Sequence, residues 1–391
     1  MNLNSDEDVG RLMAAAKVAV RLACRVTTTV QASAFSRIVK SDASPVTVAD
    51  FAAQAIISIV LQHQLALPSG TPFRMMGEED EATFRGAGPE VMARVAELVE
   101  ATIPKAAFLA ASLPDAVSGH ASAAWSVEEV VAAVGIGGYP GARVADGSSC
   151  PPFWVLDPVD GTKGFLRRGQ YAVGLAYVSC GSVSLAVIGC PNLPYPALVG
   201  GHVPGSMAAV QPAAVQAAAH ADAAVHIGTL CSALAGGGAF QEPLEPTFTE
   251  EVAGPTRLHV SSAHPSSPSF HVAQSFERTE SDAAASAHLC ASLSIVASPL
   301  LLDSMVKYCL VARGEAAAYF RLLGGTYREC IWDHAPGSLL VTEAGGVSSD
   351  VHGEALDFSH GQRLSKNVGI VASNGTAHTA ILAALRGTLP V

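Results

Sequence analysis

The sequence predicts a mixed α+β / α/β protein built from two lobes. The chain has 391 residues, which suits two domains of ordinary size or one large two-lobed unit. Hydrophobic residues make up 49% and charged residues 15%, a composition that can fill a sizeable core and is unlike that of a disordered chain. In the second half, strand patterns alternate with helix patterns, which favours a layered α/β arrangement there.

Residues 1–195 are expected to form an α+β lobe that begins with helices. Ser5 is a plausible N-cap, and apolar residues recur after it at helical spacing. The turn-rich stretch "KSDASPVTVAD" (40–50) leads into a second helix with a broad apolar face. Helices are predicted at residues 6–30, 51–67 and, with interruptions at Pro104 and Pro114, 89–134, and a short strand ending in acids is predicted at 72–80.

A β-hairpin is predicted at residues 170–191, where apolar and small residues alternate around a turn at Cys180-Gly181-Ser182. The boundary between the lobes is placed near residues 190–205. Residues 200–256 are rich in Ala, Gly and Pro, and we interpret them as strands and loops with surface insertions.

Residues 196–391 are expected to form an α/β lobe. Within "WDHAPGSLLVTEAGG" (332–346), Pro336 lies in the first helical turn, where its missing N–H costs nothing, and two glycines supply the stop. The other elements predicted in this lobe are a strand at 258–264, a helix with a loop at 266–293, a helix followed by a strand at 304–322, a strand and turn at 367–375, and a last helix at 376–387.

Charge and targeting patterns exclude several classes of function. A formal net charge of −11 argues against a general nucleic-acid binder, which needs a basic face. No apolar run reaches the roughly 20 residues of a membrane span, and the N-terminus has neither a secretory nor a transit pattern. The eight cysteines are dispersed without zinc spacing, which indicates reduced thiols. We therefore expect a cytoplasmic monomer that binds neither nucleic acid nor a membrane.

The stretch "WVLDPVDGTKGF" (154–165) ends a buried strand with two carboxylates, which is costly unless a cation neutralises them. A turn at Pro158 is predicted to bring Asp157 and Asp160 to one point, and the carbonyl of Val159 lies between them. Mg²⁺ prefers oxygen ligands of this kind. Gly161 would admit a bulky anion to the backbone, and Thr162 is predicted to be the N-cap of a short helical turn that favours phosphate.

Each acid also has a purely structural interpretation. Asp157 and Asp160 could cap a turn and pair with Lys163 or Arg167. Asp50 and Asp333 each stand where a helix begins, a common place for an N-capping acid. The run Glu78–Asp80, which follows a short predicted strand, could be a solvated loop.

Four motifs together identify a resemblance: "SPVTVAD", "GEED", "WVLDPVDGTKGF" and "WDHAPGSLLVTEAGG" occur in this order. They resemble the lithium-sensitive, magnesium-dependent phosphatase superfamily that includes inositol monophosphatase and fructose-1,6-bisphosphatase. The longer wording, including "DSMVKYCLVARG" and "YRECIWDHAPG", is similar to 3′(2′),5′-bisphosphate nucleotidases over roughly residues 36–375. The resemblance implies a layered α/β/α/β/α sandwich of the inositol monophosphatase and sugar phosphatase type, with most metal ligands in the N-terminal lobe.

The resemblance implies a metal centre with two to three Mg²⁺ ions, inhibited by Li⁺. Its ligands would be the carboxylates of Glu78, Asp157, Asp160 and Asp333 and the carbonyl of Val159. Asp50 and Thr162 would form the pair that activates the attacking water. Glu79 would orient ligands or a water.

The resemblance also implies a small-molecule substrate, a phosphoadenosine phosphate. The expected activity removes the 3′(2′)-phosphate of adenosine 3′(2′),5′-bisphosphate, giving AMP and phosphate, with 3′-phosphoadenosine 5′-phosphosulfate as a second substrate. The alternatives are an inositol polyphosphate or monophosphate phosphatase, and a catalytically silent nucleotide or metal sensor. The residues expected to contact substrate are Gly161, Thr162, His264, Ser304, Lys307, Arg321 and Asp333.

The chain departs from the family pattern at several places. Cys330 stands where relatives usually carry Lys, and Pro336 where Ala is usual. We interpret Cys330 as an inert, partly buried thiol, because no partner that would lower its pKa is evident. The Ala-rich segments 81–150 and 200–256 are the parts expected to alter the rim of the site and hence substrate preference.

Overall fold

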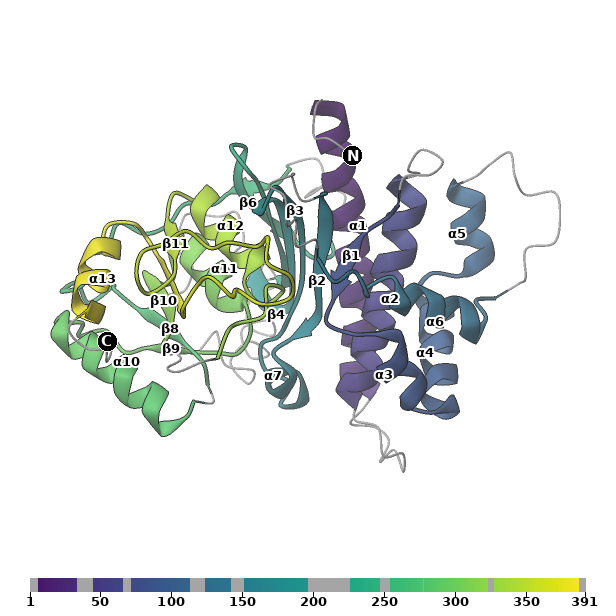
Figure 1. Cartoon of the computed structure of the whole chain (residues 1–391), viewed down its shortest axis with the longest axis horizontal. Coiled ribbons are helices and arrows are strands. Elements are labelled where there is room, and N and C mark those ends of the chain that lie inside the picture. Colours follow the sequence, from purple (N-terminus) through teal and green to yellow (C-terminus); the bar gives the residue numbers. More distant parts are fainter. Residues whose placement is uncertain are drawn as a thin grey trace.

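Helices and sheets alternate in five layers along the long axis of the molecule (Figure 1). N-terminal helices, a large sheet, a central helical layer, a smaller sheet and an outer helical layer follow one another. The predicted α/β/α/β/α sandwich is therefore confirmed. The computed structural model describes residues 6–33, 45–65, 72–112, 124–141, 151–195, 226–246, 254–276, 278–322 and 327–386.

The first sheet has seven described strands whose spatial order follows the chain. They are β1 (Met75–Gly77), β2 (Phe153–Asp160), β3 (Ala172–Ser179), β4 (Ser182–Tyr195), β5 (His226–Leu234), β6 (Gly238–Pro243) and β7 (Thr256–Arg257). The β1–β2 pair is parallel, whereas every other neighbouring pair in this sheet is antiparallel. The sheet thus has one parallel edge, formed by the three-residue strand β1.

The second sheet has five described strands in the order β11-β12-β10-β8-β9. They are β8 (Val272–Gln274), β9 (Leu300–Leu301), β10 (Ala318–Arg321), β11 (Val347–Ser349) and β12 (Ile370–Ser373). β8 runs parallel to both of its neighbours, and β12 runs antiparallel to both of its own.

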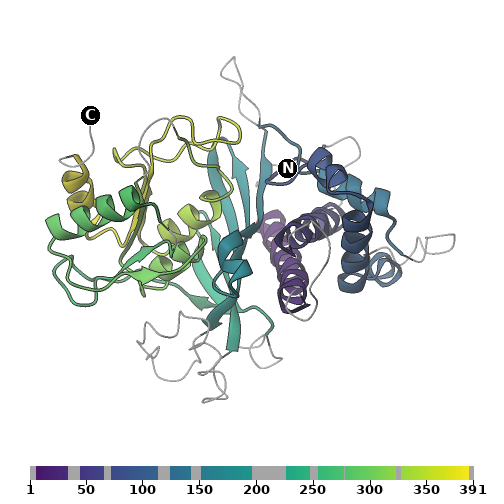
Figure 2. The ribbon, with the colours of Figure 1, turned by 90° about the horizontal axis from the view of Figure 1, so that it is seen from below.

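The helices fall into three groups around these sheets, and Figure 2 shows the N-terminal group packed beside the first sheet on the side away from the second. That group is α1 (Asp6–Ser33), α2 (Pro45–Leu65), α3 (Glu81–Gly86), α4 (Pro89–Thr102), α5 (Lys105–Ser112) and α6 (Val127–Gly135). The short α7 (Thr162–Leu166) follows β2. The central pair is α11 (Val306–Ala312) and α12 (Ala335–Glu343), and the outer pair is α10 (Glu280–Ser292) and α13 (His378–Arg386).

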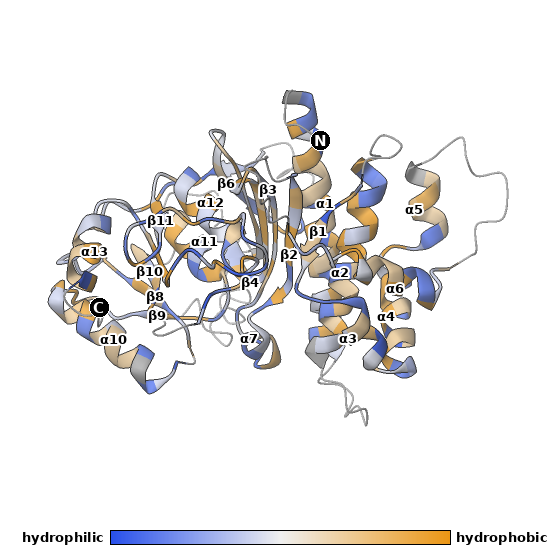
Figure 3. Ribbon diagram, in the orientation of Figure 1, coloured by the Kyte–Doolittle hydropathy of each residue, from blue (hydrophilic) through white to orange (hydrophobic). Residues whose placement is uncertain are grey.

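Both faces of the first sheet are buried, because helices cover each of them. Trp154 and Leu156 of β2 pack into the core shared with the N-terminal helices. Phe153 and Val155, which alternate with them, pack into the core shared with the central helices. Such a strand must be apolar at successive positions, which explains the unbroken run before Asp157. Figure 3 shows hydrophobic residues along β2 and α2, on either side of the first of these cores.

Most predicted elements are confirmed: the first helix, the hairpin of β3 and β4, the helix and strand within 304–322, the helix within 332–346, the strand within 367–375 and the last helix. Helix α2 begins at Pro45, so the predicted turn over 40–50 is wrong for its last six residues; proline fits the first helical turn. The short elements α3, β8, β9 and β11 were missed.

The predicted strand at 258–264 is wrong. The N–H of Leu258 still donates to the carbonyl of Ala239 in β6 at 2.8 Å, but beyond it the hydrogen bonds go to partners outside the sheet. The N–H of Val260 donates to the carbonyl of Ala344 at 3.0 Å, and the carbonyl of Ala263 accepts from Asn374 Nδ2 at 2.8 Å. The apolar alternation of "LHVSSAH" therefore reflects packing on the end of α12.

The first sheet continues beyond residue 196 and ends at β7, so it draws strands from both sides of the predicted lobe boundary. The division into 1–195 and 196–391 stays a prediction. None of the described helices is both long and apolar enough to cross a membrane, and the cytoplasmic location also stays a prediction.

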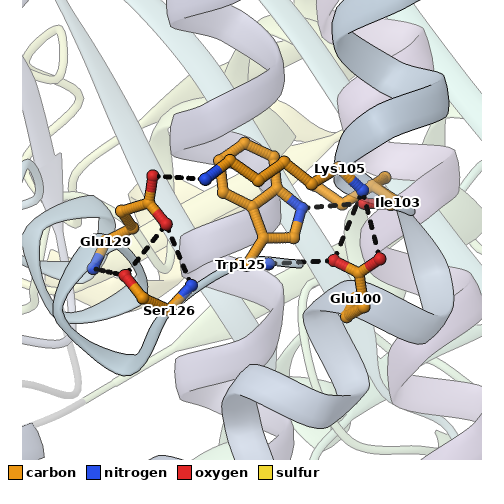
Figure 4. A network of polar contacts seen from close by, with 6 residues as sticks. All are labelled: Glu100, Ile103, Lys105, Trp125, Ser126 and Glu129. Carbon is orange, nitrogen blue, oxygen red and sulfur yellow. Dashed lines mark hydrogen bonds and ion pairs between the residues drawn. The ribbon is translucent and has the colours of Figure 1, made fainter. Parts of the chain in front are cut away.

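A polar network joins α4, α5 and α6 in the N-terminal layer (Figure 4). Lys105 pairs with Glu129 at 2.6 Å, and its Nζ lies 5.2 Å from the ring centre of Trp125. The N–H of Trp125 donates to Glu100 at 3.0 Å. Ser126 and Glu129 form a capping box at the start of α6, each side chain accepting from the other's backbone N–H. The network fixes the start of α6.

We predict that Ser126→Ala lowers the free energy of unfolding by about 1 kcal/mol, because it removes the oxygen that caps α6. Urea denaturation followed by circular dichroism measures this loss. Ser266→Ala, in an exposed loop, is the matched control and should stay within about 0.5 kcal/mol of the wild type. Equal effects of the two substitutions would contradict the capping role.

Candidate active site

Two of the predicted acids lie side by side because β1 and β2 run parallel. Gly77 pairs with Leu156, so the next residues, Glu78 and Asp157, are neighbours at the C-terminal end of β1. The N–H of Glu78 donates to the carbonyl of Leu156 at 3.2 Å and extends this register by one residue. The side chains of Glu78 and Asp157 are themselves within hydrogen-bonding reach.

A β-bulge brings the third acid to the same point. Asp157 pairs with Gly174 and Asp160 with Ala172, so three steps along β2 span only two steps along β3. Residues three apart in a regular strand point to opposite faces, and one extra residue restores the same face. The predicted turn at Pro158 is therefore wrong, although its expected consequence, two acids converging, is correct.

Asp333 reaches this cluster from the other half of the chain, just before α12. Ligand oxygens of Asp157, Asp160 and Asp333 all lie within 4.8 Å of one another. His334 is the N-cap of α12 and makes no side-chain capping bond, whereas Asp333 is within hydrogen-bonding reach of Asp157. The interpretation of Asp333 as a plain helix cap is wrong.

The crowded carboxylates raise one another's pKa values. Burial, and next the carboxylate of Glu78, raises the pKa of Asp157 well above its usual range. Desolvation, with Asp333 and then Glu79, raises the pKa of Glu78 to about 7, and burial with Asp333 raises that of Asp160 to about 6. A divalent cation with a preference for oxygen would relieve this repulsion, and carboxylates are its usual protein ligands. The residues present therefore fit a Mg²⁺ centre.

Asp50 lies beside this cluster, inside α2 and only 7% exposed. It is the sixth residue of the helix and so is not its N-cap, contrary to the structural interpretation. Burial, then the charges of Glu79 and Glu78, raises the pKa of Asp50 well above its usual range. Asp80 has a structural role other than the solvated loop considered for its group: it caps α3 by accepting from the N–H of Thr83 at 2.8 Å.

Gln54, one turn along α2 from Asp50, holds Glu79 in place and was missed by the sequence analysis. Its Nε2 donates to the carbonyls of Glu79 and Val134, at 2.6 and 2.8 Å, and its Oε1 accepts from the N–H of Glu79 at 3.2 Å. The amide fits because two glycines face it: a Cβ at Gly77 or at Gly137 would lie 2.4 Å from an amide atom. The backbone after β1 is thus braced by α2 and α6.

A pocket of about 330 Å³ opens beside the acid cluster. Seven of the predicted site residues line it, namely Asp160, Gly161, Thr162, Ser304, Lys307, Arg321 and Asp333. Lys163 lines it as well. The pocket lining therefore combines the acids Asp160 and Asp333 with the cations Lys307 of α11 and Arg321 of β10.

The wall near α11 is tied directly to Asp160. The N–H of Met305 donates to a carboxylate oxygen of Asp160. Ser304 has φ 69°, and a Cβ at Gly161 (φ 93°) would lie 2.8 Å from its Cβ. Close packing against Ser304 therefore requires glycine here, whatever ligand the pocket holds. Burial lowers the pKa of Lys307 to about 8, while the charge of Asp160 acts in the opposite direction.

The structure leaves some predicted residues away from the pocket or in a different role. His264 is exposed in the loop before β8 and does not line the pocket. Thr162 is the first residue of α7 and Gly161 is its N-cap, so the predicted cap is wrong by one residue. Arg167 pairs with Asp303, not with the strand acids. Val159 is buried, and its N–H donates to Asp157 at 3.1 Å.

The sequence analysis also missed a buried polar group in the pocket lining. Glu329 and His334 are 4% and 2% exposed, and both line the pocket with Tyr308 and Tyr319. Tyr308, Glu329 and His334 stand in the stretches "DSMVKYCLVARG" and "YRECIWDHAPG", but only the fold shows that their side chains come together. Burial and the nearby Asp333 raise the pKa of Cys330 to about 12, in agreement with an inert thiol.

Comparisons with known proteins show which family this chain resembles in sequence and in fold. The chain matches the inositol monophosphatase family over residues 11–389. A rice protein named 3′(2′),5′-bisphosphate nucleotidase is 35% identical over 380 residues, covering 96% of this chain and 94% of its own. A fission yeast (Schizosaccharomyces pombe) protein of the same name is 34% identical over 342 residues, covering 87% and 83% of the two chains.

A solved structure has the same fold. CysQ from Bacteroides thetaiotaomicron, described as a bacterial member of the inositol monophosphatase family, superimposes with a TM-score of 0.53. The alignment covers 96% of this chain and 99% of that one at 19% identity, so the likeness concerns the fold.

We predict that the protein without divalent ions loses stability as pH rises from about 5 to 8. Glu78 and Asp160 have folded pKa values of about 7 and 6, above their ordinary values, so folding favours their protonated forms. The stability they contribute is present in acid and is lost as pH rises through those values.

Thermal melts in EDTA at pH 5.5 and 8 measure this effect. Added Mg²⁺ should raise the melting temperature more at pH 8 than at pH 5.5, because the ligands must be deprotonated. Asp157→Asn, which removes one of the crowded charges, should flatten the dependence. A melting temperature in EDTA that increases from pH 5.5 to 8 would contradict the prediction.

We further predict that Gly137→Ala weakens Mg²⁺ binding by about tenfold, because the new methyl group displaces Gln54 and loosens the backbone of Glu79. Isothermal titration calorimetry with Mg²⁺ gives the affinity. Gly86→Ala is the matched control, since no atom lies within 4 Å of its added Cβ. An unchanged affinity in a folded Gly137→Ala protein would show that the brace has no role in metal binding.

Proposed function

The chain belongs to the inositol monophosphatase family, and on that premise we propose that it is a Mg²⁺-dependent phosphatase acting on adenosine 3′(2′),5′-bisphosphate. It would remove the 3′(2′)-phosphate and release AMP and phosphate, with 3′-phosphoadenosine 5′-phosphosulfate as a second substrate. The substrate assignment is supported by relatives that carry the name bisphosphate nucleotidase and align over nearly their whole length.

The observation that carries the proposal is that carboxylates and cations line one pocket. Asp160 and Asp333 border the pocket on the side of the acid cluster, and Lys307 and Arg321 line it elsewhere. A substrate with two separated phosphates matches this arrangement: one phosphate meets the metal side, and the other meets the cations. A simple inositol monophosphate has no second anionic group for Lys307 and Arg321.

Mg²⁺ held by Glu78, Asp157, Asp160, Asp333 and the carbonyl of Val159 would neutralise the phosphoryl oxygens of the substrate. Asp50, which lies beside the acid cluster, would accept the proton of the attacking water. The hydroxyl of Thr162 would orient that water together with Asp50. Glu79, braced by Gln54, would keep the neighbouring Glu78 in position.

The contacts at the other end of the pocket would select the substrate. Ser304, Lys307 and Arg321 would hold the nucleotide and its second phosphate, and Gly161 would leave room beside the reacting phosphate. His264 has no role in this proposal, because it lies outside the pocket lining. We propose two to three Mg²⁺ ions and inhibition by Li⁺, as the family resemblance implies, and a monomeric protein.

We predict that the purified protein with Mg²⁺ releases phosphate from adenosine 3′,5′-bisphosphate faster than from an inositol monophosphate. Phosphate release across a panel of both substrates, with and without EDTA, tests this. Asp50→Asn should reduce turnover by about 10²-fold or more while AMP binding, measured by calorimetry, is retained.

Two outcomes would count against the proposal. Good activity on an inositol phosphate beside none on the bisphosphate would favour the inositol alternative. If the wild-type protein and Asp50→Asn are equally inactive and both bind AMP, the result would favour a silent nucleotide sensor.

A further inference from the structure

A buried carboxylate holds Arg321, one of the residues that line the pocket. Glu329 is 4% exposed, and its Oε1 accepts from Arg321 Nε at 2.6 Å. Its second oxygen lies 3.3 Å from His334 Nε2. A charged side chain is buried this completely in proteins when partners fix it, and here both partners line the pocket.

The contacts continue through His334 to α11. Nδ1 of His334 lies 2.8 Å from the hydroxyl of Tyr308, a residue that is 1% exposed and follows Lys307 in sequence. Tyr308, His334, Glu329 and Arg321 therefore form one chain of contacts that links α11, the start of α12 and β10. Each member lines the same pocket, and Glu329 and His334 lie beside Asp333 of the acid cluster.

The contact with Glu329 leaves the outer edge of Arg321 available. Nε is occupied, and among the described residues no hydrogen bond reaches either Nη atom. The side chain is 38% exposed, while Glu329 beneath it is not. A guanidinium fixed through Nε can present both Nη groups as a planar fork, which suits two oxygens of a phosphate.

A cation site at this place is the competing interpretation, since Glu329, Asp333 and His334 have ligand atoms within 4.8 Å of one another. Although Nε2 of His334 and the second oxygen of Glu329 make no hydrogen bond among the described residues, one contact argues against it. The positive guanidinium of Arg321 already neutralises Glu329. A second positive ion would lie beside an existing one.

We propose that Glu329 is a positioning residue: it fixes Arg321 so that its Nη edge binds the second phosphate of the substrate, away from the reacting one. This inference rests on the proposed function and deepens it. Glu329 would act on substrate affinity and selectivity through Arg321. It would not contact the reacting phosphate.

The test compares adenosine 3′,5′-bisphosphate with adenosine 3′-monophosphate, which lacks the second phosphate. Glu329→Ala should raise KM for the bisphosphate by on the order of tenfold, because a hydrogen bond to a charged group is lost. The kcat for the bisphosphate, and both constants for the monophosphate, should change by less than about threefold. Arg321→Ala should show the same selectivity, and adding Glu329→Ala to it should have little further effect.

Two further variants separate positioning from general destabilisation. Glu329→Gln keeps an acceptor for Nε and loses only the charge, so its KM should fall between those of wild type and Glu329→Ala. Glu315→Ala removes another ion pair to a buried arginine, Arg313 at 2.6 Å, outside the pocket, and should leave the ratio of the two KM values unchanged. If Glu329→Ala does not fold, Glu329→Gln makes the same comparison.

Three outcomes for Glu329→Ala would overturn the inference and leave the proposed function intact. They are equal effects on both substrates, a fall in kcat at constant KM, and full additivity with Arg321→Ala. A folded wild-type protein that hydrolyses neither nucleotide would overturn the proposed function and this inference with it.

Discussion

Repulsion among acids that cannot move apart is the constraint on which the rest of the structure depends. Asp157, Asp160 and Asp333 converge within 4.8 Å, with Glu78 beside them. Their mutual repulsion and desolvation favour dispersal or protonation. The sheet buried on both faces, the parallel β1–β2 pair and the bulge after Asp157 resist dispersal, because moving any one acid would disrupt a packed layer. The fold thereby keeps these carboxylates together, where a divalent cation would relieve their repulsion.

The two sides of the site are held by different means. Glu78 and Glu79 follow a three-residue edge strand, and Gln54 of α2 and the segment after α6 hold that strand from outside. Arg321 and Lys307 come from the second sheet and the central helices, where Glu329 and Tyr319 surround them. The N-terminal helices thus hold Glu78 and Glu79, whereas the second sheet and the central helices hold Arg321 and Lys307.

The sequence could predict the acids because their spacing and order follow motifs, and it could predict the main helices and the hairpin because their periodicity is strong. It could not predict the bulge, since Pro158 is equally compatible with a turn and with an irregular strand. Gln54 escaped because its partners are backbone groups distant in sequence, and Glu329 because no pattern in the sequence indicates its pair with Arg321, eight residues away. His264 was assigned by its place in a weakly matched stretch, and only three-dimensional packing shows that it lies outside the pocket lining.

The separation of the acids along the chain has a consequence for biosynthesis. Glu78 and Asp157 are made before Asp333, which arrives only with α12. A ribosome-bound or C-terminally truncated chain has the first sheet's acids without their last partner and without the cations of the second sheet. The nascent chain therefore lacks the complete ligand set, and the centre forms only when both sheets have folded around α11 and α12.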